Sequence, residues 1–399
     1  MLYDPERHID FEPEAWHPER VRAWLEQWSQ TALETWERQQ GWPVHPRDAS
    51  DYGEQPPAQL YSLYCGAFGV WLALARLAEA GICRLPATLA ELLSQVYAGY
   101  SQAPDTGECV PSWYLGESSL LTALELTVPD PDRASQLAEM IIANRNNPTR
   151  EALWGAPGTM LAALMLWEKT GQSRWRELYL DSVEAIWASW EYDDAAGVWL
   201  WEQDMYGRHT HYLGAGHGWA GNLYPLWRGM ELLDAEHQAV LSARTLQGLG
   251  VLGLVEGELA NWPALAGSNE RQLVQWCHGM PGLITSLRWA SLPMALPLLL
   301  QGGDLIVAAG PLRKGVSLCH GTDGNAIALL ELYRRTGDSA WLAQARQFAL
   351  WALNQSEAEF SHHGVWRYTL WTGDAGLACV LLDCLEGHAS GMPGLDAFW

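Results

Sequence analysis

The stretch CHGTDGNAIALLELY, residues 319–333, decides the fold, because its pattern of glycines and apolar residues is repeated along the chain. In each copy an aromatic residue or leucine is followed by Gly-x-x-Gly and then by an apolar run at helical spacing. Glycine at a helix start allows close backbone approach, and an almost wholly apolar run predicts a helix that is buried on most sides. Seven copies are visible. The two glycine positions of the successive copies are 66 and 69, 116 and 119, 155 and 158, 218 and 221, 279 and 282, 321 and 324, and 373 and 376. The second copy has serine in place of its second glycine.

Amphipathic segments rich in tryptophan and arginine lie between these runs, for example at 174–183 and 339–348. Their half-polar character predicts an outer layer of helices around the buried ones. No convincing series of alternating strand residues is present, so we expect an all-α fold in which two concentric helical layers close into an α/α toroid. One domain then accounts for residues 1–399. Residues 1–60 are expected to form an N-terminal extension with outer helices, in which 24–36 is amphipathic and 41–57 is a connecting loop.

Composition limits the classes of function. The 399 residues are 48% hydrophobic, include 24 tryptophans and carry a formal net charge of -23. Such a chain can bury a large core, and its acidic balance argues against nucleic-acid binding. The first residues lack a signal peptide's basic and apolar regions, and no apolar window reaches the roughly 18 residues of a membrane helix. We therefore expect a cytoplasmic protein without a membrane span.

The tripeptide Cys-His-Gly occurs twice, at 277–279 and 319–321, each time ahead of an apolar helical stretch. Thiolate and imidazole together suit Zn²⁺, and the dipole of a following helix favours a thiolate. The two motifs predict the halves of a zinc site, against the alternative of buried thiols and core histidines. If both histidines bound, the site would be a closed Cys₂His₂ tetrahedron, which is typical of structural zinc. The other five of the seven cysteines are interpreted as buried thiols.

With these motifs in this order, the chain resembles the lanthionine synthetase C-like family, and the resemblance spans all seven repeats. It implies a seven-fold α/α toroid with zinc held by Cys277, Cys319 and His320, the fourth position being left to water or a substrate thiol. Bacterial cyclases of the family add a cysteine thiol to dehydroalanine or dehydrobutyrine and form a thioether ring. Eukaryotic-like members, which this chain resembles more closely, add glutathione to dehydroamino acids in proteins.

The resemblance also assigns further residues. His217 falls where the family keeps a catalytic histidine, and Glu151 stands where the cyclases carry aspartate. Lys314 matches a basic residue that contacts glutathione in the eukaryotic relatives. Arg367 is expected to play a similar part, and His278 is expected to face the substrate. The implied partners are a peptide or protein with dehydrated Ser or Thr, a thiol donor and a separate dehydratase, since the repeats fill the chain.

The chemistry explains these residue types. A thiol has a pKa near about 8.5, and coordination to Zn²⁺ makes it a thiolate at neutral pH. Attack on the β-carbon leaves negative charge on an enolate, so an acid must deliver a proton to Cα. His217 is the candidate acid. Glu151 could orient that imidazole, or take a proton from an incoming thiol or from the Cα of a phosphoseryl residue.

Alternatives stay open at this point. A peptide cyclase competes with a glutathione-adding enzyme, and the spelling of both zinc motifs with Glu151 and Lys314 favours the second. An α/α-barrel carbohydrate-active enzyme would use paired carboxylates instead, and a non-catalytic protein could bind zinc or glutathione without turnover. Among the residues, Glu151 could serve only the helix dipole, Lys314 could be a surface lysine, and Arg367 could stack on neighbouring aromatic rings.

Overall fold

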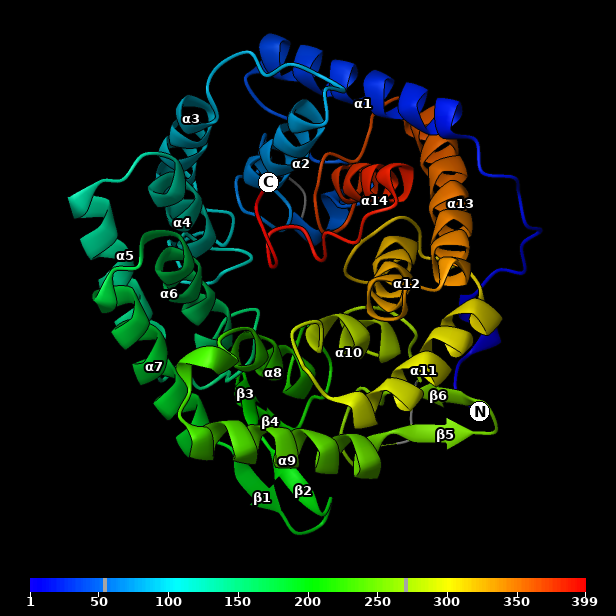
Figure 1. Cartoon of the computed structure of the whole chain (residues 1–399). Coiled ribbons are helices and arrows are strands. Elements are labelled where there is room, and N and C mark those ends of the chain that lie inside the picture. Colours follow the sequence, from blue (N-terminus) through cyan, green and yellow to red (C-terminus); the bar gives the residue numbers. More distant parts are fainter. Residues whose placement is uncertain (53–55, 269–271) are drawn as a thin grey trace. The chain divides into compact units, whose positions relative to one another are not determined.

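The computed structural model describes residues 1–52, 56–268 and 272–399, and it is mostly helical (Figure 1). Fourteen α-helices and three two-stranded hairpins are found within these residues. The chain divides into two compact units. The first unit comprises Met1–Ile9, Pro111–Trp113 and Pro129–Gly310, and the second comprises Asp10–Val110, Tyr114–Val128 and Pro311–Trp399.

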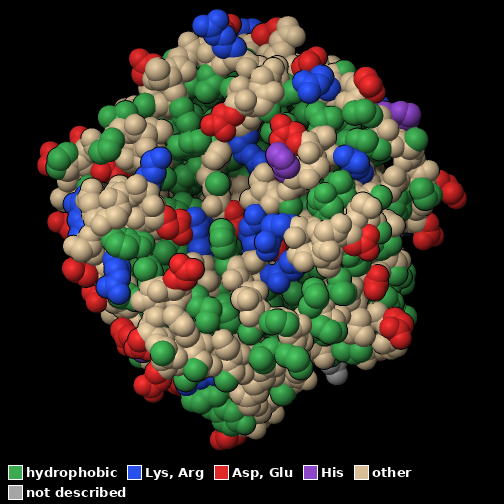
Figure 2. Space-filling model, viewed as in Figure 1, with side chains coloured by type: hydrophobic (Ala, Val, Ile, Leu, Met, Phe, Trp, Pro, Cys, Tyr) green, Lys and Arg blue, Asp and Glu red, His purple; other side chains and the backbone are tan. Residues whose placement is uncertain are grey.

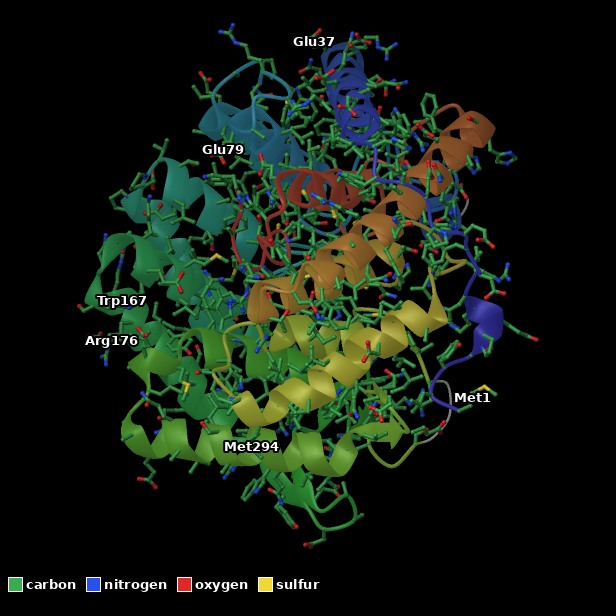
Figure 3. The ribbon with its side chains drawn as sticks, turned by 45° about the vertical axis from the view of Figure 1, so that its right-hand side comes forward. Met1, Glu37, Glu79, Trp167, Arg176 and Met294 are labelled. Carbon is green, nitrogen blue, oxygen red and sulfur yellow. The ribbon has the colours of Figure 1, made fainter. Side chains whose placement is uncertain are left out.

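The first unit holds helices α5 to α11. Their bounds are α5 (Pro131–Asn144), α6 (Ala156–Thr170), α7 (Ser173–Ala188), α8 (Trp219–Arg228), α9 (Ala235–Leu252), α10 (Met280–Ser286) and α11 (Leu296–Ala309). Helix α7 packs along α6, as Figure 3 shows with Trp167 marking α6 and Arg176 marking α7. Helix α8 packs between α6 and α10, and α10 packs against α11.

The same unit contains the hairpins, each made of three-residue antiparallel strands. Strand β1 (Glu191–Asp193) pairs with β2 (Val198–Leu200), β3 (Gln203–Met205) with β4 (Arg208–Thr210), and β5 (Leu254–Glu256) with β6 (Leu259–Asn261). The prediction of a purely helical fold is therefore wrong in this detail. The strands escape sequence analysis because three residues are too few to display an alternation of apolar and polar side chains.

The second unit joins segments from both ends of the chain. It contains α1 (Pro18–Gln39), α2 (Ala67–Glu79), α3 (Leu89–Gln102), α4 (Ser118–Thr127), α12 (Thr322–Thr336), α13 (Ser339–His363) and α14 (Asp374–Glu386). Helix α14 packs against α1, α2, α12 and α13, and α3 packs against α2 and α4 (Figure 1). The predicted connecting loop at 41–57 contains a short 3₁₀ helix, Ala49–Tyr52, and its residues 53–55 lie outside the described part.

All seven predicted repeats begin a helix. The first glycine of the pair is the N-cap of α2, α6, α8, α10, α12 and α14, and in the second copy Glu117, next to Gly116, precedes α4. These helices are buried nearly all round: in α12, the eleven residues from Thr322 to Leu332 are all buried. The helices between them bury one face only, as in α3, whose buried residues are Leu92, Leu93, Val96 and Tyr100. The predicted alternation of buried and amphipathic helices is thus confirmed within each unit.

The second glycine of a repeat allows the helix to lie against a backbone carbonyl six residues upstream. A Cβ atom at Gly282 would come within 1.9 Å of the carbonyl oxygen of Trp276, and one at Gly376 within 2.3 Å of that of Leu370. Contacts this short are incompatible with any side chain. The glycine therefore holds the first helical turn close to the loop that precedes it, and in the repeats with Cys277 and Cys319 this loop carries the cysteine.

Charged side chains of both signs are interspersed over the face shown in Figure 2. In the parts of the chain that the structure describes, none of the helices combines the length and apolarity needed to cross a membrane. Among the five remaining cysteines, Cys379 and Cys384 are buried as expected. Cys65 and Cys83 are half-buried and Cys109 is exposed, so the expectation of a buried thiol is wrong for Cys109.

Candidate active site

Glu151 is a buried carboxylate in the turn before α6. Its exposed fraction is 0%, and its two oxygens accept hydrogen bonds from the backbone N–H groups of Leu153 at 2.9 Å and Trp154 at 2.7 Å. Asn222, in the first turn of α8, donates to the carbonyl oxygen of Arg150 at 2.8 Å and so ties the turn to α8. Arg150 itself has φ 45°, a left-handed conformation that is costly for a residue with a side chain. The turn is therefore held in a fixed, strained shape that presents Glu151.

His217 is the partner of this carboxylate. Its Nδ1 lies 2.8 Å from Oε2 of Glu151, and 27% of its side chain is exposed. Burial works against protonation of the ring, but the hydrogen bond and the negative charge of Glu151, with a contribution from Cys277, outweigh it and raise the pKa of His217. Gly218, which follows with φ 105°, lets the chain turn from His217 directly into α8. The arrangement presents a partly exposed imidazole whose protonated form is stabilised.

Cys277 and His278 lie against the loop that carries His217. The backbone N–H of Gly216 donates to the carbonyl oxygen of Cys277 at 3.3 Å, and a Cβ atom at Gly214 would come within 1.9 Å of the same oxygen. The ring of His278 lies 6.0 Å from that of His217, and Tyr212 lies 6.0 Å from His217 and 5.5 Å from His278. The structure thus brings four predicted residues, Glu151, His217, Cys277 and His278, into one site of the first unit.

The pKa values of the two histidines of this site are shifted in opposite directions. Burial, followed by the positive charge of His217, lowers the pKa of His278 to about 4. Its Nδ1 is buried and has no hydrogen-bond partner among the described residues. The site therefore holds one imidazole whose pKa is raised and, beside it, one that is neutral at neutral pH.

Cys319 and His320 lie in the turn just before α12 in the second unit. The backbone N–H of Cys319 donates to the carbonyl oxygen of Trp371 at 3.1 Å, and that of His320 donates to Oγ of Ser317 at 3.2 Å. Ser317 in turn donates to the carbonyl oxygen of Trp371 at 2.8 Å. Burial and the nearby positive charges of Lys314 and Arg367 lower the pKa of His320 to about 3, so its imidazole is neutral.

A pocket of about 440 Å³ opens beside His320, and we call it the strap pocket. One wall is the strap, residues 41–52, and the other walls come from the turns before α2, α12 and α14. Lys314, Ser317, His320 and Arg367 line it together with strap residues. The structure therefore brings the predicted residues Lys314, His320 and Arg367 together in the second unit.

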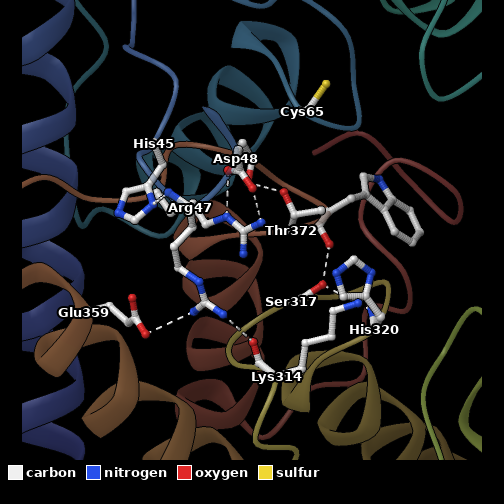
Figure 4. A network of polar contacts seen from close by, with 12 residues as sticks. His45, Arg47, Asp48, Cys65, Lys314, Ser317, His320, Glu359 and Thr372 are labelled. Atoms are coloured by element: carbon white, nitrogen blue, oxygen red, sulfur yellow. Dashed lines mark hydrogen bonds and ion pairs between the residues drawn. The ribbon is translucent and has the colours of Figure 1, made fainter. Parts of the chain in front are cut away.

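Strap side chains hold both predicted cationic residues in place (Figure 4). Arg47 donates to the carbonyl oxygen of Lys314 at 3.0 Å and to Oε1 of Glu359 at 3.0 Å. Nε of Arg367 donates to Oδ2 of Asp48 at 2.8 Å, and Nη2 of the same guanidinium donates to Oδ1. The alternative in which Arg367 only stacks on aromatic rings is set aside, because its guanidinium is bound by a carboxylate.

The predicted zinc ligands fit the metal by their chemistry. Cys277 and Cys319 are each 8% exposed, and Nε2 of Gln275 donates to Sγ of Cys277 at 3.0 Å. An N–H group directed at sulfur supports a thiolate, and a neutral imidazole such as that of His320 is the form that binds metal. Among the described residues, no three His, Cys, Asp or Glu side chains form a group that could hold a metal ion. Zinc binding therefore stays a prediction.

Sequence analysis missed several residues of these sites. Tyr212 gave no signal, since a tyrosine five positions before a histidine matches no motif. Arg47 and Asp48 lie in the Gly- and Pro-rich stretch whose composition predicts only a connecting loop. Binding residues are often placed on loops, but the loop composition alone does not show which of its charged residues face a pocket.

The chain is similar to known proteins in sequence and in fold. The family model described as "Lanthionine synthetase C-like protein" matches residues 57–396. "Glutathione S-transferase LANCL1" of Danio rerio is 27% identical over 279 residues, which is 66% of this chain and 65% of that protein. "LanC-like protein GCL1" of Arabidopsis thaliana is 31% identical over 150 residues, 34% of this chain and 33% of that protein. The matches thus span less than two thirds of the length of either relative.

Among solved structures, "Nisin cyclase" is similar to this chain with a TM-score of 0.62, and the alignment covers 90% of this chain and 93% of that chain. The two sequences are 15% identical, so this likeness is one of fold.

Proposed function

Because the chain belongs to the lanthionine synthetase C-like family, we propose that it adds a thiol to dehydroalanine or dehydrobutyrine residues of a peptide or protein. The product is a thioether, either an adduct of a small thiol such as glutathione or a ring closed by a cysteine of the same peptide. The 27% identity with a protein named a glutathione transferase favours the small thiol.

The observation that carries the proposal is the bond between His217 and Glu151. Nδ1 of the imidazole donates to a carboxylate that is wholly buried and held by two backbone N–H groups, so Nε2 is the nitrogen left for the substrate. A carboxylate in this position fixes the ring orientation and stabilises the protonated imidazole. The pair is suited to delivering a proton to a carbanion-like centre.

His217 and solvent account for every proton transfer of the proposed reaction. The sulfur of the thiol donor forms a bond to Cβ while the Cα=Cβ π bond breaks, and that electron pair passes onto the carbonyl oxygen as an enolate. Nε2 of His217 then gives its proton to Cα, and the enolate collapses to the amide carbonyl. The proton lost by the thiol returns to His217 through solvent, so that no net proton is consumed.

Glu151 is the orienting residue in this scheme, since its oxygens are occupied by Nδ1 of His217 and by backbone N–H groups. The neutral ring of His278 and the ring of Tyr212 lie beside His217, each with its centroid 6.0 Å from that of the His217 ring. We propose that these rings limit the access of water to His217, which would strengthen the electrostatic stabilisation of the enolate.

Cys277, Cys319 and His320 are the proposed zinc ligands. When bound, Zn²⁺ would lower the pKa of the donor thiol so that it attacks as a thiolate. Within the chain, Gln275 supports the sulfur of Cys277 through its N–H group, and Ser317 and Trp371 fix the backbone of Cys319 and His320. Lys314 and Arg367 of the strap pocket are proposed to bind the thiol donor.

Further expectations from the sequence belong to the same proposal. Residues 1–399 form one domain, a seven-fold α/α toroid, in the cytoplasm, and a separate dehydratase supplies the dehydroamino acid. Support comes from the seven buried helices that the repeats begin and from the fold likeness to nisin cyclase.

Mass spectrometry tests the proposal and separates its two forms. Zinc-loaded protein is incubated with glutathione and a dehydroalanine peptide that lacks cysteine, and in parallel with a peptide that contains both groups. A mass gain of one glutathione on the first peptide establishes intermolecular addition. Loss of the thiol at unchanged mass in the second peptide establishes cyclisation. If neither peptide changes, the protein binds without turnover and the proposal is wrong.

A further inference from the structure

The strap pocket is lined by five charged side chains, of which three are paired within the protein and two are not. Arg367 is bound by both oxygens of Asp48, and only 14% and 13% of these side chains are exposed. This pair is neutral as a unit. Arg47 is the third paired side chain, and its partner is Glu359 at 3.0 Å.

The remaining two charges are the ammonium of Lys314 and the carboxylate of Asp51, both of which line the pocket. Neither side chain makes a hydrogen bond or an ion pair with another of the residues that the structure describes. One cation and one anion are therefore left to face the same cavity of about 440 Å³. Cavities of this size hold small organic ligands.

Strap residues anchor the backbone from which these two exposed side chains extend. Arg47 holds the carbonyl oxygen of Lys314 at 3.0 Å, and Asp48 holds Arg367. The backbone N–H of Asp51 donates to the carbonyl oxygen of Asp48 at 3.0 Å, so Asp51 belongs to the same anchored turn. Both charges therefore extend into the pocket from anchored backbone, and a ligand that pairs with both would order two exposed side chains but no loop.

We infer that the strap pocket binds its thiol donor as a zwitterion, with Asp51 pairing with an α-ammonium group of the donor and Lys314 with a carboxylate. The inference rests on the proposed function, and it adds a specificity residue, Asp51, to it. A purely anionic thiol would leave Asp51 facing like charge, and a purely cationic thiol would leave Lys314 in the same position, so both are disfavoured. Cysteine, γ-glutamylcysteine and glutathione carry the required groups.

Calorimetric binding of unreactive ligands tests the inference without requiring turnover. S-methylglutathione is compared with its des-amino analogue, in which glutaric acid replaces the glutamate and the ammonium is absent. The wild-type protein is expected to bind the des-amino analogue about five-fold more weakly, since partly exposed ion pairs contribute modestly. Asp51→Asn is expected to bind both ligands with equal affinity, close to that of the wild type for the analogue.

Two further variants complete the design. Lys314→Gln is expected to bind both ligands more weakly. The ratio of the two affinities should stay as in the wild type, because the contact with the ammonium is intact. Asp10→Asn changes an exposed aspartate of the second unit that does not line the pocket, and it should behave as the wild type. Unfolding temperatures of all variants show whether the fold is retained.

Equal wild-type affinity for the two ligands, or an unchanged preference in Asp51→Asn, would overturn the inference, as would the absence of binding. The outcomes separate it from the proposed function. Preference for the ammonium without adduct formation supports this inference and removes the proposed activity, whereas adduct formation without the preference supports the activity and removes this inference.

Discussion

Nδ1 of His217 lies 2.8 Å from Oε2 of Glu151, although 66 residues separate the two in the chain. The carboxylate is wholly buried and accepts hydrogen bonds from two backbone N–H groups. Its side-chain partner is the imidazole of His217, which it holds in place. Because Nδ1 is taken, only Nε2 can exchange a proton with a substrate. The repeat architecture makes this possible by placing both residues just before the starts of neighbouring buried helices, α6 and α8.

This bond predicts the pH dependence of thiol addition. The pKa of His217 is raised, so the imidazole is the required acid below that pKa and loses its proton as pH rises through it. The rate should therefore fall on the alkaline side. In Glu151→Gln the raising charge is gone while burial remains, so the alkaline limb should move to lower pH and kcat should drop by about 10²-fold. Initial rates between pH 5.5 and 9 measure both changes.

The control for this profile is His209→Gln, which changes a histidine of the first unit whose side chain is 61% exposed and pairs with Glu202. Its pH profile should match that of the wild type. An alkaline limb that stays in place in Glu151→Gln would contradict the assignment of Glu151 as the residue that orients and charges His217.

The glycine of the Cys277 repeat predicts a large effect on stability. In Gly282→Ala, the new Cβ would lie 1.9 Å from the carbonyl oxygen of Trp276 and 2.8 Å from Cβ of Ala215. Overpacking against backbone cannot relax by a rotamer change, so we expect a loss of about 3 kcal/mol or more. Gly250→Ala in α9 meets nothing within 4 Å and should be stabilising by up to about 1 kcal/mol. Similar unfolding midpoints for the two variants would contradict this account of the repeat.

His45 predicts a loss of stability in mild acid. Burial, followed by the positive charges of His363 and Arg367, lowers the pKa of His45 to about 4. As the pH falls from 6.5 to 4, the unfolded chain binds a proton at this histidine that the folded chain does not bind. The free energy of unfolding therefore decreases over this range, by about 3 kcal/mol in all.

Urea unfolding at pH 7 and pH 4.5 measures this effect. In His45→Asn the amide oxygen can still accept the N–H of Arg47 that Nδ1 accepts at 3.2 Å, while the titrating group is removed. The difference between the two pH values should shrink in this variant and stay unchanged in the exposed control His17→Gln. An equal difference in all three proteins would show that other groups cause the acid sensitivity.

Metal content tests the ligand set independently of activity. Cys277→Ala and Cys319→Ala should each lose most of the bound zinc, because a three-ligand site with one thiolate removed binds far more weakly. Cys379→Ala changes a buried cysteine within α14 and should keep the wild-type zinc content. Elemental analysis of dialysed protein gives the zinc-to-protein ratio, and full zinc in Cys319→Ala would exclude that residue as a ligand.

The sequence predicts the helices well, because the pattern that it repeats is the physical cause of their burial. Gly-x-x-Gly predicts the helix starts to within a residue or two, since the glycines are demanded by backbone contacts such as that at Gly282. The hairpin at Gln203–Thr210 shows the limit. Its strands are three residues long, and its shape depends on Tyr206 and Gly207 having positive φ, which a polar loop sequence does not distinguish from other turns.

Single site residues are predictable where a motif surrounds them, as for Cys319 and His320. Their partners are not, because Asp48 and Arg367 are 319 positions apart and their ion pair depends on tertiary packing. The same holds for Glu151, whose candidate role came from a resemblance and whose contact with His217 is given only by the structure.

The most direct test is the rate at which glutathione adds to a dehydroalanine peptide, followed by product mass, with wild-type protein and His217→Ala compared at equal zinc content. We predict a glutathione adduct with the wild type and a rate lower by 10² to 10⁴-fold in His217→Ala, the range for loss of a general acid. An adduct that forms equally fast with both proteins would contradict the account, because the bond between His217 and Glu151 would then have no part in the chemistry.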